Sequence, residues 1–103
     1  MSRREEIRVP GLAEPISHYT DAVRAGDLLF ISGCVPVDAD GRLVPGDVVK
    51  VTVFLVDVDD RAAVNTVRQE VFGAARPAST LVEVSRLAIP GARIEVEAVA
   101  LLA

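Results

Sequence analysis

Alternation of hydrophobic and polar residues along much of the chain predicts a sheet. In the longest such run, residues 48–58, the polar residues Lys50 and Thr52 fall on one side of a strand, because side chains alternate between its two faces. The hydrophobic residues of the other side are Val49, Val51, Val53 and Leu55. Three more strands are predicted, a short one at 7–10 and two at 79–87 and 93–101.

A change of period after this long strand predicts a helix. Between residues 59 and 73, apolar side chains recur at three- and four-residue spacing, as they do on one face of a helix. Asp59 or Asp60 is placed to cap the start of the helix, and Gly73 is placed to end it.

Turn residues and the single helix set the organisation of the chain. Gly26 predicts a hairpin, and Asp40-Gly41 predicts a second turn. A sheet of five or six strands is poorly covered by one short helix, so apolar surface is left bare. Either other subunits bury this surface, or a segment is absent between Asp47 and Val48.

Length, charge and composition narrow the class of protein. The 103 residues suit a single domain spanning 1–103. A net charge of −4 argues against nucleic-acid binding, and no apolar run approaches the roughly 20 residues of a membrane span. The first residues lack the apolar core of a signal peptide, and Cys34 is the only cysteine, so we expect a cytoplasmic protein without an internal disulfide. With one cysteine and one histidine, no His/Cys zinc site forms within a chain.

Few residues are candidates for chemistry. Glu95 and Glu97 project from one face of the last strand. They either belong to a solvated surface or provide a carboxylate that orients or deprotonates a water molecule. Tyr19, the only tyrosine, suits either packing or a small-molecule pocket. Ser79 and Thr80 form a small polar pair at the mouth of the strand at 79–87.

Four stretches of the chain carry a resemblance to a known family. They are YTDAVRAGDLLFISGCVPVD, VVKVTVFLVDVDDRAAVN, VEVSRL and IEVEAVAL. In this order they resemble the YjgF/RidA family of small reactive-intermediate deaminases. The resemblance implies an α+β, chorismate-mutase-like fold, in which a curved, mostly antiparallel sheet of about six strands is backed by two helices. It also implies a homotrimer whose small-molecule ligands bind in clefts between subunits.

One departure from the family concerns the bare sheet face. Family members carry a helix of some 20 or more residues just before the strand that begins at Val48, and this chain has none there. Losing a helix would expose several apolar side chains, each worth about 1.5–3 kcal/mol when buried. We therefore expect that a helical segment is missing from these 103 residues between Asp47 and Val48, and favour this over a true deletion.

The resemblance also assigns roles to individual residues. Active members hydrolyse 2-imino or enamine acids to 2-keto acids and ammonia, without a cofactor or metal. Glu95 matches the glutamate that positions the attacking water, and Tyr19 matches the tyrosine of the pocket. The other positions that line the family's pocket correspond in this chain to Ser32, Gly33, Asn65, Ser79, Thr80 and Leu81.

A second departure lies at Ser79, which occupies the place of the arginine that grips the substrate carboxylate. A hydroxyl is a single neutral donor, whereas arginine is a charged fork. The resemblance therefore favours an imine or enamine hydrolase for which ordinary 2-iminoacid deamination is weakened, unless Arg76 or a neighbouring subunit supplies the charge. The alternative is a non-catalytic trimer that binds a metabolite or has a regulatory role. Ribonuclease activity, attached to some relatives, is disfavoured by the acidic charge.

Overall fold

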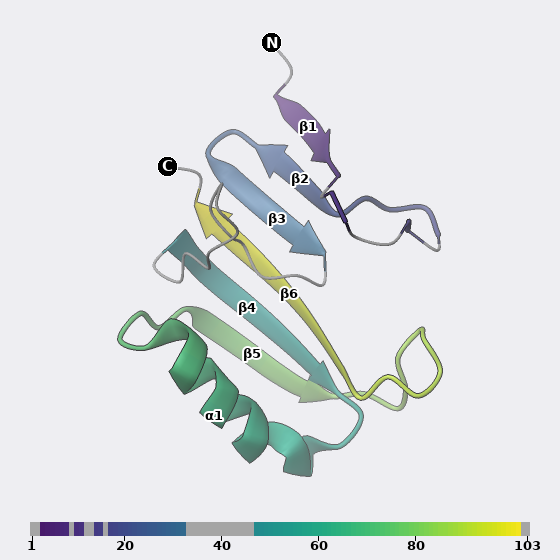
Figure 1. Ribbon diagram of the computed structural model, residues 1–103, viewed down its shortest axis with the longest axis vertical. Helices are drawn as coiled ribbons and strands as arrows, with labels where there is room; N and C mark the ends of the chain where they lie inside the picture. Colours follow the sequence, from purple (N-terminus) through teal and green to yellow (C-terminus); the bar gives the residue numbers. More distant parts are fainter. Residues whose placement is uncertain (1–2, 9, 12–13, 16, 33–46, 102–103) are drawn as a thin grey trace.

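The computed structural model describes residues 3–8, 10–11, 14–15, 17–32 and 47–101 (Figure 1). These residues form six strands, one short 3₁₀ helix and one α-helix. The strands are β1 (Arg4–Ile7), β2 (Ala22–Ala25), β3 (Leu28–Ser32), β4 (Val48–Leu55), β5 (Ala78–Glu83) and β6 (Ile94–Leu101). Between β4 and β5 lie the 3₁₀ helix η2 (Val58–Asp60) and the α-helix α1 (Arg61–Phe72).

All six strands belong to one sheet, in the order β1-β2-β3-β6-β4-β5. Neighbouring strands are antiparallel except β4 and β5, which run parallel because α1 carries the chain back between them. Figure 1 shows α1 lying along the β4–β5 end of the sheet, with β1 and β2 at the other end. The predicted α+β class and the mostly antiparallel sheet of about six strands are confirmed.

Strand pairing explains where the predicted boundaries were wrong. The first strand covers residues 4–7 and not 7–10, because the hairpin at Gly26 brings β2 opposite these residues. Gly26 itself has a φ of +60°, as the predicted turn requires. The strand predicted at 79–87 ends at Glu83, because β4 ends at Leu55, its pairing partner. The predicted turn at 40–41 lies outside the described residues.

The prediction for Val49 was also wrong, and a register shift is the reason. Val49 is 39% exposed, whereas Val48 is 5% exposed and joins the core. The pairing of β4 with β6 shifts between Val48 and Lys50, so the strict alternation assumed from the sequence is interrupted there. From Val51 onward the predicted alternation holds.

The helix has nearly the predicted limits but a different cap. Asp60 occupies the N-cap of α1 without a capping hydrogen bond, and instead accepts one from Arg93 over 2.7 Å. Asp57 does the capping one turn earlier, where its Oδ1 accepts from the backbone N–H of Asp59 over 2.9 Å. Gly73 ends the helix at a φ of +57°, as predicted.

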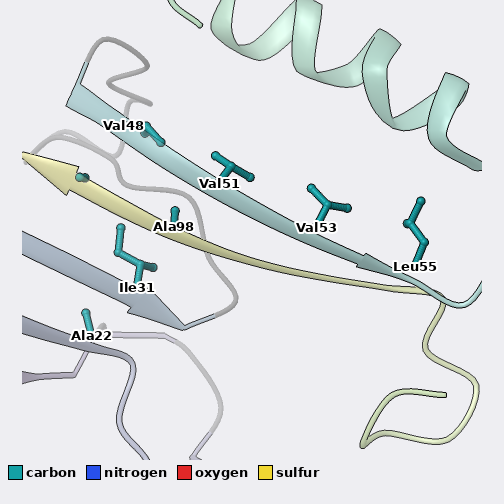
Figure 2. Close-up of a cluster of buried hydrophobic side chains, with 8 residues drawn as sticks. Ala22, Ile31, Val48, Val51, Val53, Leu55 and Ala98 are labelled. Atoms are coloured by element: carbon teal, nitrogen blue, oxygen red, sulfur yellow. The ribbon is translucent and has the colours of Figure 1, made fainter. Parts of the chain in front are cut away.

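The core lies on the face of the sheet against which α1 packs. Its buried side chains are Ala22, Ile31, Val48, Val51, Val53, Leu55, Ala98 and Ala100. Figure 2 shows Val51, Val53 and Leu55 projecting from β4 toward the helix. On the helix side, Val64 and Phe72 pack against this cluster while remaining partly exposed. The core is therefore small and depends on β4.

An ion pair joins the segment after β1 to the start of β2. Asp21 is buried and accepts a hydrogen bond from Nε of Arg8 over 2.9 Å, and Nη1 of Arg8 reaches Glu14 over 3.0 Å. The Asp21 hydrogen bond, followed by that of Glu14, raises the pKa of the Arg8 guanidinium. Thr20 adds a hydrogen bond to the carbonyl of Ile7 over 3.2 Å. These contacts hold β1 at the edge of the sheet.

Replacing Leu55 by alanine should destabilise the fold strongly. Leu55 is 1% exposed, and a Leu→Ala change at a buried site typically costs about 2–5 kcal/mol because a cavity remains. Urea unfolding followed by circular dichroism measures the free energy of unfolding. Val67→Ala is the matched control, since Val67 is 55% exposed and its truncation should change the value by no more than about 0.5 kcal/mol. Equal effects of the two changes would contradict the proposed core.

Candidate functional site

The sheet has two faces of different character. Side chains of β4 and β6 that point toward the helix, such as Val51, Val53 and Ala98, form what we call the α1 face. Residues that alternate with them point the opposite way and form the open face, which no described helix covers.

Glu95 and Glu97 lie together on the open face, as the sequence predicted. Both alternate along β6 with residues of the α1 face, and both are exposed. Glu95 pairs with Phe54 of β4, and Glu97 is flanked by Thr52 of β4 and Ser32 of β3. Within the described part of the chain, neither carboxylate forms an ion pair. Because β6 is a central strand, these acidic groups stand in the middle of the face.

Large apolar side chains surround the two carboxylates on the open face. Leu28 and Phe30 on β3 are 37% and 46% exposed, Leu101 on β6 is 46% exposed, and Val82 on β5 is 39% exposed. The pairs Leu28–Leu101 and Phe30–Val99 place their side chains on the same side as Glu97. An apolar surface of this kind usually marks a contact with another molecule.

The polar pair at the mouth of β5 is divided between the two faces. Ser79 pairs with Val51 and therefore lies on the α1 face, where Nη1 of Arg68 donates a hydrogen bond to its Oγ over 2.6 Å. Thr80 lies on the open face, where Nζ of Lys50 donates to its Oγ1 over 2.7 Å. Each hydroxyl thus accepts a hydrogen bond from a positively charged side chain.

The sequence did not single out Lys50 or Arg68. Their positions follow from the parallel pairing of β4 with β5, which sets Lys50 beside residue 78, and from the crossover that lays α1 over β5. Arg68 comes one helical turn after Val64, which packs on the core. This four-residue spacing could have indicated that Arg68 faces the sheet.

The remaining predicted residues are spread over the molecule. Asn65 is exposed on α1, and Tyr19 is 51% exposed in the segment before β2. Ser32 is exposed at the end of β3, whereas Leu81 is partly buried against the core. Gly33 and Cys34 lie outside the described residues.

Two groups of candidate residues are therefore separated by the sheet. Glu95 lies on the open face with Thr80, while Ser79 lies on the α1 face, beneath the helix that carries Asn65. A single chain does not bring Glu95 and Ser79 together. Arg76 is exposed just before β5, and among the described residues it has no ion-pair partner.

A hollow of about 310 Å³ opens beside α1. Its walls are apolar, with Ala63, Val67 and Val71 on the helix and Val51, Ile94 and Val96 on the strands among the lining residues. Arg68 is also among the lining residues. Val67 and Ile94 remain 55% and 45% exposed, so the face next to the helix is incompletely covered.

The described residues show no site for a metal and no membrane helix. Over these ranges, His, Cys, Asp and Glu side chains do not gather in groups of three or more that would hold an ion. Likewise, no helix in the described ranges is long and apolar enough to cross a membrane.

Comparison with known proteins identifies close relatives. A profile of the family described as Endoribonuclease L-PSP matches residues 45–102. A RutC family protein of Pyrococcus horikoshii is 37% identical over 123 residues, covering 94% of this chain and 97% of the relative. A 2-iminobutanoate/2-iminopropanoate deaminase of Capra hircus is 33% identical, covering 82% and 80%. The crystal structure of the YjgF gene product from E. coli matches with a TM-score of 0.75 at 28% identity, covering 94% and 98%.

The Pyrococcus alignment is longer than the part of this chain that it contains. It extends over 123 residues, whereas 94% of 103 residues is about 97. About 26 positions of that alignment therefore have no residue in this chain.

Proposed function

Since the chain belongs to the Endoribonuclease L-PSP family, which includes YjgF-type proteins, we propose that it is a hydrolase of small imine- or enamine-type metabolites. The proposed sites are clefts between the subunits of a homotrimer. A relative that is named as a deaminase of two imino acids supports this class of substrate. The proposed location is the cytoplasm.

The open face is the observation that carries the proposal. It places two carboxylates without ion-pair partners, as far as the structure is described, among exposed apolar side chains such as Phe30 and Leu101. Packing this face against another copy would bury the apolar groups and remove bulk water from around the carboxylates. A carboxylate in such a place holds and deprotonates a single water molecule far better than a solvated one does.

The separation of the two residue groups supports a site made by two copies. Glu95 of one copy has to meet Asn65 and Ser79 of another, because these residues lie on opposite faces of the same sheet. Each cleft would then be incomplete without a neighbouring subunit. A closed ring of identical contacts gives every subunit one such cleft.

The proposed chemistry needs only water and a proton route. Glu95 accepts a proton from a water molecule whose oxygen attacks the carbon of the C=N bond, forming a carbinolamine. That proton passes to nitrogen, with the hydroxyl of Tyr19 available as donor and acceptor. The hydroxyl of the carbinolamine then gives its own proton to nitrogen by the same route, so the C–N bond breaks with ammonia as the leaving group and a C=O bond forms. Water and imine are converted to a carbonyl compound and ammonia, so neither a cofactor nor a metal takes part.

The small side chain at Ser79 favours a second candidate function. Its single neutral hydroxyl binds a carboxylate weakly, so the clefts of this protein would serve for metabolite binding or regulation if no other group supplied a charge. Cleavage of RNA is the least favoured activity, because the net charge is −4 and an acidic protein repels the phosphates of RNA.

Replacing Glu95 by glutamine should abolish most of the hydrolysis of freshly generated 2-iminobutanoate. A glutamine side chain keeps the shape but cannot accept the proton of water, and loss of a general base typically lowers the rate about 10²- to 10⁴-fold. Ammonia release measures the rate. Glu70→Gln is the matched control, because Glu70 is an exposed residue of α1 outside the proposed site and should leave the rate unchanged. An unaltered rate in Glu95→Gln would contradict the proposed mechanism.

Mixing two inactive variants should restore part of the activity. In a cleft shared by two copies, Glu95→Gln and Asn65→Ala impair different sides, so random co-assembly leaves about a quarter of the clefts with both native residues. The measurement is imine hydrolysis after the two variants are unfolded and refolded together. Each variant refolded alone is the control. Absence of any recovery in a mixed assembly would place both residues in the same subunit's site.

We also propose that a helical segment, expected between Asp47 and Val48, packs in the hollow beside α1. The roughly 26 unmatched positions of the Pyrococcus alignment are enough for such a helix and its connections. The family match begins at residue 45, close to this junction. The partly exposed Val67 and Ile94 are apolar groups that the segment would cover.

Inserting the corresponding segment of the Pyrococcus protein at this junction should stabilise the chain. Burying the equivalent of one to two valine side chains raises the free energy of unfolding by about 2–4 kcal/mol. Urea unfolding measures the change, and binding of a hydrophobic dye should fall. A flexible Gly/Ser insert of the same length is the control and should not stabilise. Equal stability of the two insertion variants would show that the segment does not pack in the hollow.

A further inference from the structure

We propose that Arg68 is the carboxylate-binding residue of the cleft and that Ser79 holds it in position. This inference rests on the proposed function, because it names the group that recognises the acidic part of an imine substrate. In the proposed site, the carboxylate of a 2-imino acid would lie on the guanidinium of Arg68.

The position of the guanidinium supports this role. Nη1 of Arg68 lies 2.6 Å from Oγ of Ser79. The positively charged guanidinium therefore lies at the start of β5, although its backbone belongs to the neighbouring helix. A guanidinium has five N–H donors, and a contact with one hydroxyl leaves enough of them for a bidentate carboxylate. In the described part of the chain, no acidic side chain pairs with Arg68.

The surroundings of Arg68 limit its motion. Arg68 is one of the residues that line the apolar hollow, and its backbone belongs to the middle of α1. Ser79 then fixes the outer end of the side chain through the hydrogen bond. A guanidinium held at its base and tip loses little conformational freedom when a carboxylate binds.

The geometry also explains why residue 79 is small. The Arg68 guanidinium already lies next to the side chain of residue 79. An arginine at position 79 would therefore place a second positive charge beside it, and the two charges would repel each other. Arg68 and Ser79 therefore act as a pair, and either residue of the pair could carry the arginine, but not both. Lys50 does not compete for this role, because it serves Thr80 on the open face.

Equilibrium binding of 2-oxobutanoate tests the proposal without turnover. Butanone, which lacks the carboxylate, is the neutral comparison, and both are titrated by NMR against the native protein and Arg68→Gln. Loss of a charge-assisted contact should weaken 2-oxobutanoate binding on the order of 10- to 100-fold while butanone binding stays the same. Arg61→Gln, a change at an exposed arginine of the same helix, is the matched control and should have no effect.

Exchange of the pair provides a second test. Ser79→Arg alone should weaken 2-oxobutanoate binding, because it removes the hydroxyl that holds Nη1 of Arg68 and its own charge repels the Arg68 guanidinium from that position. The double variant Arg68→Ser with Ser79→Arg should restore binding to within a few fold of the native protein. Circular dichroism confirms that each variant is folded.

The outcomes separate this inference from the proposed function. Carboxylate binding that depends on Arg68 in a protein that hydrolyses no imine would support the anchor and reject the hydrolase. Imine hydrolysis that depends on Glu95 but is unaffected by Arg68→Gln would reject the anchor alone. No measurable binding of 2-oxobutanoate, or a loss confined to Arg76→Gln, would also overturn the assignment to Arg68.

Discussion

Packing of β4 beneath α1 is the interaction on which the rest of the structure depends. β4 lies between β6 and β5, and its buried side chains Val51, Val53 and Leu55 supply much of the core. Its parallel pairing with β5 requires the crossover that α1 provides. If β4 were displaced by one residue, Lys50 and Thr52 would point into the core, so this packing sets the register of the sheet.

That register divides the chemistry of the molecule between two faces. The α1 face contains the core, the hollow and the Arg68–Ser79 contact. The open face carries Glu95 and Glu97 among exposed apolar groups, with Lys50 bound to Thr80 nearby. The alternation that builds a stable strand therefore also keeps an acidic group and a guanidinium apart within one chain. A reaction that needs both has to use two copies, which connects the fold with the proposed cleft.

The start of β5 distinguishes this protein within its family. The family relationship supports a small-molecule role. At residue 79, however, the strand carries a hydroxyl, and the nearest guanidinium comes from the helix. In the proposed site, the guanidinium that meets the ligand carboxylate therefore comes from the helix and not from the strand. The incompletely covered hollow next to α1 is the other individual feature.

The sequence by itself determined the α+β class, the hairpin at Gly26, the limits of the helix and the shared face of Glu95 and Glu97. The α+β class was implied by the family resemblance that four stretches of the chain carry. The other three features depend on local periodicity and turn chemistry, which a single chain segment expresses without its partners. Tertiary structure alone decided that Val48 and not Val49 is buried, because that depends on a register shift against β6, a strand some 45 residues away in the chain. It also decided that Lys50 and Arg68 meet Thr80 and Ser79, because those contacts arise only when β5 is laid beside β4 and under α1. Local pattern indicates which residues of a regular strand share a face, whereas register shifts and contact partners come from pairing between distant segments.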